Sequence, residues 1–212
     1  MKLIEEKIHF DGPAGTIELI VENPGAARGI ALICHPHPLF GGTNGNKVVQ
    51  TLARTFAQLG YVALRPNFRG IGASSGTHDD GQGETDDMLA VLAEAKRRYG
   101  DLPVALAGFS FGAYVQTRVA QALAEAAHPA QRLVLVGTAA GHVEGARKYA
   151  TRAVASDTIV IHGAVDETVP LANVLAWAEP LNLPVIVIPG ADHFFHRRLN
   201  IIRDIVTRAW RH

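Results

Sequence analysis

The chain has 212 residues, 48% of them hydrophobic, with 20 basic and 20 acidic side chains. This balance gives no net field that would favour nucleic acid or an anionic membrane as a partner, and the hydrophobic content is typical of a globular protein. One cysteine excludes an internal disulfide, and no apolar run reaches the length of a membrane-spanning helix. Since the start also lacks the apolar segment of a signal peptide, we expect a single cytoplasmic domain over residues 1–212.

The first two predicted strands, residues 3–10 and 16–22, form a hairpin with a turn at residues 11–13. Beyond them, apolar strand-like runs alternate with helical patterns. Further strands are expected at 30–35, 61–65, 103–108, 132–137, 158–162 and 184–189, and helices at 46–59, 84–99, 111–126, 142–150, 171–178 and 197–211. Such alternation indicates a parallel sheet covered by helices on both faces. The predicted fold is therefore α/β, with a mostly parallel eight-stranded sheet.

Residues 108–112 read Gly-Phe-Ser-Phe-Gly, between a predicted strand and a predicted helix. In this context the pattern is typical of a sharp turn that lifts a nucleophilic serine above the sheet. A Cβ at Gly108 or Gly112 would collide with the neighbouring strand or helix. The helix that follows directs its amino terminus at negative charge that develops there. Ser110 is therefore the predicted nucleophile.

A nucleophilic serine needs a histidine base that is held by a third group. Asp166 lies in the loop after the predicted strand 158–162, and His193 lies in the loop after the predicted strand 184–189. Catalytic groups of parallel sheets gather at the carboxyl ends of the strands. We therefore expect Asp166 and His193 to meet Ser110 at one edge of the sheet, as orienting acid and base.

Other acidic and histidine residues compete for these roles. Asp192 adjoins His193, and adjacent loop side chains point apart, so Asp192 is a poor orienting group. Glu167 could act as the acid if the loop were shifted by one residue. His196 is expected at the surface or behind the base, and His162 is expected to be a structural residue at a strand end.

A further polar cluster lies near the start of the predicted helix 84–99. Its three carboxylates between residues 84 and 87 are explained by their interaction with the helix dipole, without any ligand. His78, Asp79 and Asp80 precede them on a polar, Gly-rich loop and are expected to be solvated.

Cleavage of an acyl bond also needs N–H donors for the oxyanion. The first predicted donor is the backbone N–H of Phe111, directly after the serine. The second is expected from the loop after the third strand, whose sequence from His35 to Gly42 is His-Pro-His-Pro-Leu-Phe-Gly-Gly. Because proline has no N–H, His37 is the first choice, with Leu39 or Phe40 as alternatives.

The paired histidines His35 and His37 also raise the question of a metal site. No acidic or cysteine partner stands at ligand spacing, and Cys34 belongs to the predicted strand before them. No Gly-rich dinucleotide loop follows the first strands. We therefore expect neither a metal nor an organic cofactor.

With these motifs the chain resembles the α/β-hydrolase superfamily over essentially its whole length, and more narrowly a small lidless bacterial branch related to dienelactone hydrolases. The matching segments are 35–42, 46–50, 67–74, 108–113 and 190–195. The resemblance implies an α/β-hydrolase fold with Ser110, Asp166 and His193 in the roles above, and it implies no substrate. Dienelactone hydrolases use a cysteine nucleophile, whereas position 110 is serine, so ordinary ester or amide chemistry is expected.

Many such relatives carry a helical cap where this chain has residues 137–158. Only about twenty residues join the two strands here, enough for one helix and its loops. We therefore expect no cap domain and an open site. Its aromatic lining is expected from Phe40, Phe68, Phe109, Phe194 and Phe195, some of them in the core. Phe40 and Phe194 are the predicted substrate-binding residues.

The expected function is hydrolysis of carboxylic esters with small acyl groups, through an acyl-enzyme. The alternatives are an amidase or peptidase, a thioesterase, and a hydrolase-fold binding protein without catalysis. The expected partner is a small-molecule ester, and neither nucleic acid nor a membrane is expected. The sequence indicates no oligomeric state.

Overall fold

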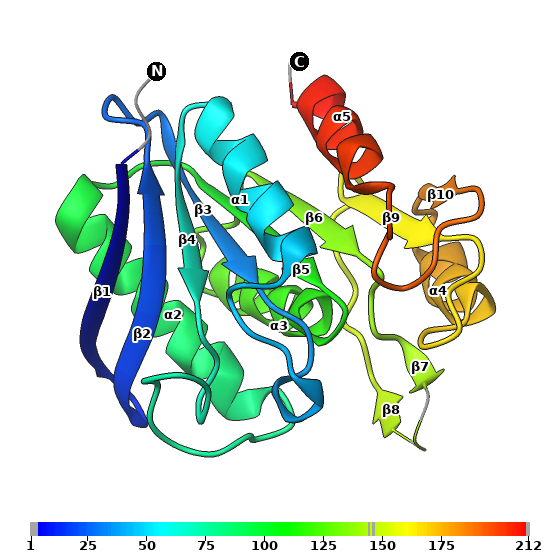
Figure 1. Ribbon diagram of the computed structural model, residues 1–212, viewed down its shortest axis with the longest axis horizontal. Helices are drawn as coiled ribbons and strands as arrows, with labels where there is room; N and C mark the ends of the chain where they lie inside the picture. The colour runs from blue at the N-terminus through cyan, green and yellow to red at the C-terminus, as the bar shows by residue number, and fades with distance from the viewer. Residues whose placement is uncertain (1–3, 144, 146, 211–212) are drawn as a thin grey trace.

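The computed structural model describes residues 4–143, 145 and 147–210. Its centre is an eight-stranded sheet with the order β1-β2-β4-β3-β5-β6-β9-β10 (Figure 1). The strands are β1 (Ile4–Gly12), β2 (Gly15–Asn23), β3 (Gly29–Cys34), β4 (Tyr61–Pro66), β5 (Val104–Phe109), β6 (Arg132–Val136), β9 (Ile159–Gly163) and β10 (Val185–Ile188). β1 pairs antiparallel with β2, and β2 pairs antiparallel with β4. The strands from β4 to β10 in this order are parallel, so the predicted hairpin and mostly parallel sheet are confirmed.

Helices cover both faces of the sheet. One face carries α1 (Lys47–Gln58) and α5 (Leu199–Ala209), and the other carries α2 (Gln82–Tyr99), α3 (Phe111–Glu125) and α4 (Leu171–Ala178) (Figure 1). The side chains of strand β3 are buried on both faces of the sheet, which explains why the strand is apolar at every position. Ile30 and Leu32 pack towards α2 and α3, while Ala31 and Ile33 pack towards α1 and α5. A strand that is buried on both faces has no polar side.

The prediction of a helix at 142–150 is wrong. Strands β7 (Gly141–Val143) and β8 (Arg147–Tyr149) form an antiparallel hairpin there. Gly141 and Gly145 adopt positive φ angles of 62° and 76°, which an α-helix does not allow, and glycine is itself a poor helix former. The described residues between 137 and 158 contain no α-helix. The hairpin lies at the carboxyl end of the parallel strands, close to the loop that contains the short 3₁₀ helix η1 (Pro38–Phe40) (Figure 1).

No helix in the described part of the chain combines the length and the apolar character that crossing a membrane requires.

Candidate active site

Ser110 occupies the turn between β5 and α3, with φ 56° and ψ −117°. This region is rarely adopted by residues with a Cβ and costs on the order of 1–3 kcal/mol. An added Cβ on Gly108 would lie 2.4 Å from the carbonyl oxygen of Gly112, and one on Gly112 would lie 2.4 Å from those of Cys34 and His35. These distances confirm the predicted reason for both glycines.

Backbone hydrogen bonds hold this turn in place. The N–H of Ser110 donates to the carbonyl of Val136 on β6, at 2.9 Å. The Ser110 carbonyl accepts from the N–H groups of Ala113 at 3.0 Å and Ala139 at 3.3 Å. The strained serine is therefore fixed from the neighbouring strand, from its own helix and from the loop after β6.

His193 and Asp166 lie beside Ser110, as the sequence predicts. Nε2 of His193 is 3.0 Å from Oγ of Ser110, and Nδ1 of His193 is 2.7 Å from Oδ2 of Asp166. When Nδ1–H donates to the carboxylate, the lone pair of Nε2 faces the serine hydroxyl. All three side chains are buried, with residue exposures of 6–8%. These two hydrogen bonds therefore allow a proton to move from Ser110 towards His193.

A tight turn after β9 positions Asp166. Its Oδ1 accepts the N–H groups of Thr168 at 3.0 Å and Val169 at 2.8 Å, which leaves Oδ2 for His193. His162 supports the same turn, because its Nε2 donates to the carbonyl of Val169 at 2.9 Å. Burial lowers the pKa of His162, so its ring is neutral and structural, as expected.

The competing residues lie outside this row. Asp192 accepts from the ring and the backbone N–H of His196, at 2.5 Å and 3.1 Å, and does not contact the Nδ1 of His193. The side chain of His196 is 73% exposed, and Glu167 is exposed at the surface.

Hydrogen bonds within the loop after β3 distinguish between the candidate oxyanion donors. The N–H of Phe40 donates to the carbonyl of His37 at 3.1 Å, and the N–H of Leu39 faces the His37 ring at 3.3 Å. Both alternatives to His37 are therefore occupied within the loop. No hydrogen bond among the described residues uses the N–H of His37 or that of Phe111. These two groups remain available for an oxyanion.

The ring of His37 packs among other rings. Its centroid lies 4.9 Å from that of Phe40, 4.7 Å from that of His78 and 4.8 Å from that of Phe111. Burial, with the nearby charges of His78 and Arg147, lowers the pKa of His37 to about 4. The ring is therefore neutral at pH 7 and acts as packing beneath the loop.

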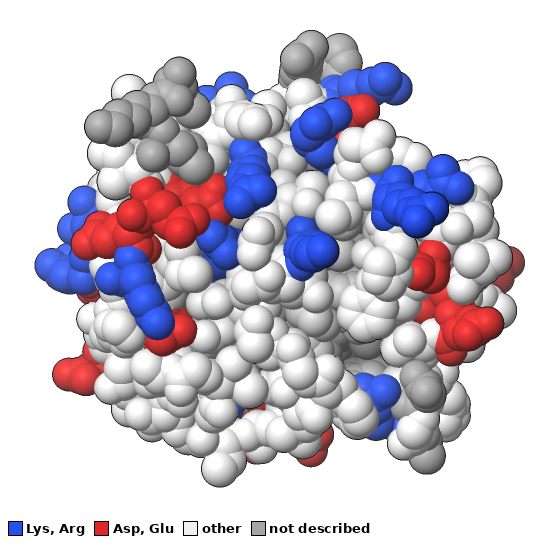
Figure 2. Space-filling model, viewed as in Figure 1, with Lys and Arg blue, Asp and Glu red and all other residues white. Residues whose placement is uncertain are grey.

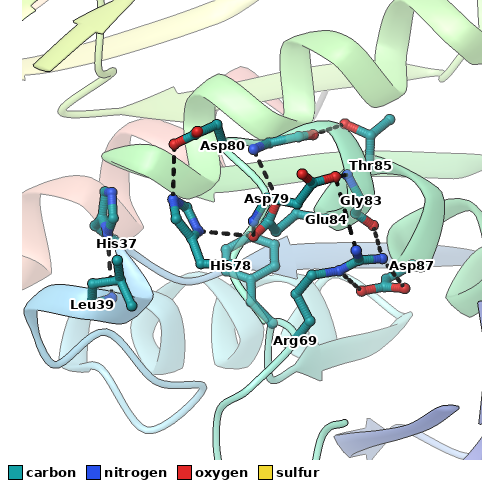
Figure 3. A network of polar contacts seen from close by, with 12 residues as sticks. His37, Leu39, Arg69, His78, Asp79, Asp80, Gly83, Glu84, Thr85 and Asp87 are labelled. Carbon is teal, nitrogen blue, oxygen red and sulfur yellow. Dashed lines mark hydrogen bonds and ion pairs between the residues drawn. The ribbon is translucent and has the colours of Figure 1, made fainter. Parts of the chain in front are cut away.

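The expectation that His78 is solvated is wrong. Its side chain is 11% exposed and lies with Nδ1 2.9 Å from Oε1 of Glu84, whose side chain has no exposed surface. The carboxylate of Glu84 also accepts the N–H groups of Asp79 at 2.9 Å and Gly81 at 2.8 Å (Figure 3). The side chains of Asp80, 3.3 Å from Nε2 of His78, and of Asp79 are 99% and 58% exposed, as expected for these two residues. Glu84 stands three residues after Gly81 and accepts its N–H, as the glutamate of a capping box does, and this spacing was the available signal.

The same network continues to a second carboxylate of α2 (Figure 3). Asp87 accepts from Nε and Nη2 of Arg69, at 2.8 Å and 2.9 Å, and Arg69 also donates to the carbonyl of Gly83 at 2.7 Å. Asp87 is therefore explained by this paired contact as well as by the helix dipole.

The aromatic lining is narrower than predicted. Phe40 and Phe194 are 67% and 49% exposed, whereas Phe68, Phe109 and Phe195 have 0% exposure. The guanidinium of Arg147, on β8, lies 4.2 Å from the ring centroid of Phe40. Phe40 and Phe194 are therefore surface aromatics, and their role in binding substrate stays a prediction. Phe68, Phe109 and Phe195 belong to the core.

His35 has no nitrogen free to bind a metal. Its Nδ1 donates to the carbonyl of Pro36 at 2.7 Å, and its Nε2 accepts the N–H of Phe68 at 2.9 Å. Burial lowers the pKa of His35 to about 4 and raises that of the buried Cys34 thiol. Within the described ranges, no three His, Cys, Asp or Glu side chains are grouped so as to hold a metal ion.

Residues 25–166 match the model of the family described as serine aminopeptidase, S33. The chain belongs to this family. A solved structure described as an α/β serine hydrolase homologue from Coxiella burnetii is similar to this chain. The two are 37% identical, with a TM-score of 0.84 over 97% of each chain.

Two further relatives extend the comparison. XC6422 from Xanthomonas campestris, described as an α/β serine hydrolase without a lid, is 33% identical, with a TM-score of 0.84 over 100% of this chain and 95% of that one. The uncharacterized protein RP471 of Rickettsia prowazekii is 39% identical over 126 residues, which are 58% of this chain and 52% of that protein. The match thus spans about half the length of this curated relative.

The solved structures confirm the predicted fold class, because both are α/β serine hydrolases that cover nearly the whole chain. This family member is therefore an α/β hydrolase with a mostly parallel eight-stranded sheet. The narrower resemblance to dienelactone hydrolases stays an expectation.

Proposed function

We propose that this hydrolase cleaves carboxylic esters with small acyl groups through a Ser110–His193–Asp166 triad. The observation that carries the proposal is the row of hydrogen bonds from Oγ to Nε2 at 3.0 Å and from Nδ1 to Oδ2 at 2.7 Å. Serine is a weak nucleophile until a positioned base accepts its proton, and these hydrogen bonds support His193 as that base.

In the first half-reaction, Oγ of Ser110 attacks the acyl carbon while Nε2 of His193 takes the hydroxyl proton. The carboxylate of Asp166 stabilises the resulting imidazolium. Nε2–H then gives the proton to the leaving oxygen, the C–O bond breaks, and an alcohol departs from the acylated serine. In the second half-reaction, a water molecule attacks the acyl carbon, His193 takes its proton, and the acid leaves as Ser110 regains a proton.

The negative charge of each tetrahedral intermediate needs donors on the side away from His193. The N–H groups of Phe111 and His37 supply them in this proposal, because neither has another acceptor among the described residues. Phe111 is also the first residue of α3, so the helix dipole adds to its effect. Loss of one such donor typically lowers kcat by about 10²- to 10³-fold.

The test is hydrolysis of p-nitrophenyl acetate by Ser110→Ala and by a matched control, Ser156→Ala, whose side chain is exposed. We expect kcat to fall by about 10⁴- to 10⁶-fold in Ser110→Ala and to stay unchanged in Ser156→Ala. A fluorophosphonate probe should label the wild type and the control, but not Ser110→Ala. Residual activity above a tenth of the wild-type value would refute the proposal.

A second candidate is cleavage of an amide or peptide bond, which the description of the matching family favours. The same triad could perform it. An aminopeptidase must also bind a free ammonium group, and the exposed cations Lys47 and Arg197, with Arg147 over Phe40, would repel that charge. Comparing p-nitrophenyl acetate with alanine p-nitroanilide decides between the two, and faster turnover of the anilide would favour the peptidase.

A further inference from the structure

A cavity of about 420 Å³ lies between the first turn of α1 and the loop before α5, whose residues Phe194 to Arg197 follow His193 directly in the chain. Its lining includes Lys47, Val48, Phe194, His196, Arg197 and Leu199. A volume of this size is typical of pockets that hold small organic ligands. The mechanism proposed above assigns no role to this cavity.

Phe194 connects the cavity to the proposed chemistry. Its ring centroid is 5.2 Å from that of His193, and the residue is 49% exposed, so one side chain borders both the base and the cavity. His193 must protonate the leaving oxygen, which therefore lies within hydrogen-bond reach of Nε2. The part of the substrate attached to that oxygen is then the part that reaches Phe194 and the cavity beyond it.

The cavity is positively charged. Lys47 and Arg197 are exposed, and no hydrogen bond or ion pair among the described residues engages either side chain. The adjacent carboxylate, Asp192, is occupied by the ring and N–H of His196. Some other surface cations of this chain are paired with carboxylates, such as Arg97 with Glu94 at 2.7 Å and Lys96 with Asp101 at 2.8 Å. Two cations without a partner at an apolar wall match an anion attached to an apolar group.

The wider surface agrees with this charge. In Figure 2, basic side chains lie over α1, α5 and the loop before α5, with one acidic group among them over α5. Acidic side chains gather over β1 and β2, where basic ones accompany them, and around α4. A negatively charged substrate would therefore be attracted to this side of the molecule.

We propose that the cavity is a leaving-group subsite that binds an alcohol or phenol carrying a carboxylate or phosphate, with Phe194 against its apolar part and Lys47 and Arg197 on its anion. The proposal rests on the ester hydrolysis proposed above. It names the substrate class of that reaction as esters with an anionic leaving group.

The test compares three acetate esters that differ in the leaving group: 4-acetoxyphenylacetate, its uncharged methyl ester, and 4-acetoxyphenyl phosphate. We expect the wild type to hydrolyse the two anions with kcat/KM at least about tenfold higher than the uncharged ester, mainly through KM. In Lys47→Gln/Arg197→Gln the ratio of kcat/KM for the anionic esters to kcat/KM for the uncharged ester should fall to about one, with the uncharged ester unaffected. In the wild type, 0.5 M NaCl should lower the same ratio.

The matched control is Arg54→Gln/Arg198→Gln, which removes the same charge from exposed residues of the same face that do not line this cavity. It should keep the preference. Equal loss in both double variants, or no preference in the wild type, would overturn the subsite. Comparing kcat/KM for 4-acetoxyphenyl phosphate with that for 4-acetoxyphenylacetate shows whether the phosphate or the carboxylate is the better ligand.

Calorimetric binding of 4-acetoxyphenylacetate to Ser110→Ala separates this proposal from the proposed function. Binding that is lost in Ser110→Ala/Lys47→Gln/Arg197→Gln supports the subsite even if no ester is turned over. Absence of binding refutes the subsite even if uncharged esters are hydrolysed.

Discussion

Nδ1 of His78 lies 2.9 Å from the buried carboxylate of Glu84, and the ring of His78 packs on that of His37 with centroids 4.7 Å apart. A carboxylate at the start of α2 therefore supports the loop whose N–H we propose as an oxyanion donor. His78 has no role in proton transfer in the proposed mechanism, so it acts as a positioning residue.

We expect His78→Ala to lower kcat by about tenfold with little change in KM, because the unsupported loop misplaces the His37 N–H. His78→Phe retains a ring against His37 and should keep more of the activity. His128→Ala, at an exposed position, is the control. Steady-state kinetics with p-nitrophenyl acetate and thermal unfolding of each variant check this. An equal fall in kcat in both His78 variants, with the unfolding temperature lowered to the same extent, would show a merely structural role.

Substitution of the orienting acid should be severe. In Asp166→Asn the amide oxygen still accepts the two backbone N–H groups, so its NH2 group faces Nδ1 of His193 and favours the wrong tautomer. We therefore expect kcat to fall by about 10⁴-fold without loss of the fold. Glu167→Gln, one residue away and exposed, should keep wild-type kcat. The opposite pattern would assign the acid to Glu167.

The folding stability should depend on pH through His35. Burial lowers its pKa in the folded protein to about 4, against 6.5 as the ordinary value. Between these values the unfolded chain binds more protons than the folded one, so this contribution is present above pH 6.5 and is lost as the pH falls towards 4. The loss amounts to about 3 kcal/mol.

Urea unfolding of the wild type and His35→Gln at several pH values isolates this effect. The glutamine does not titrate, so the difference in unfolding free energy between the two proteins should shrink as the pH falls from 6.5 to 4. A difference that stays constant across this range would contradict a neutral, buried His35.

The close approach at the serine turn predicts a steric effect on folding. A Cβ at position 112 would lie 2.4 Å from two carbonyl oxygens, so we expect Gly112→Ala to destabilise the protein by about 3 kcal/mol. Gly45→Ala is the control, since its Cβ would meet its nearest neighbour at 3.4 Å. Equal unfolding midpoints for the two variants would refute the steric argument.

The short β7–β8 hairpin predicts how the enzyme responds to acyl length. With no α-helix among the described residues of 137–158, we expect no activation at a lipid–water interface and the highest kcat/KM with short acyl chains. A series of p-nitrophenyl esters from acetate to palmitate, measured below and above their solubility limits, tests this. A maximum at long chains with a rate increase once an interface forms would point to a mobile cover over the site.

The elements that the sequence predicted correctly are those fixed by local patterns. Strands buried on both faces are apolar throughout, as β3 is. The alternation of strands and helices along the chain predicts a parallel sheet. The order of the loops then brought Ser110, Asp166 and His193 to one edge. Local patterns were insufficient at 142–150, where a helix was predicted, because two glycines with positive φ favour the hairpin observed there.

By itself the sequence determined the fold class, the serine turn and the order of its partners, because steric limits within a few residues and strand-end geometry act locally. Only the tertiary structure decided which polar loop residues are buried. Glu84 and His78 are enclosed because α2 packs beside the loop after β3, and Lys47 and Arg197 meet at one cavity because the first turn of α1 lies against the loop before α5. Such convergence depends on packing between segments that are distant in the chain, and beyond the spacing of Gly81 and Glu84 no local pattern encodes it.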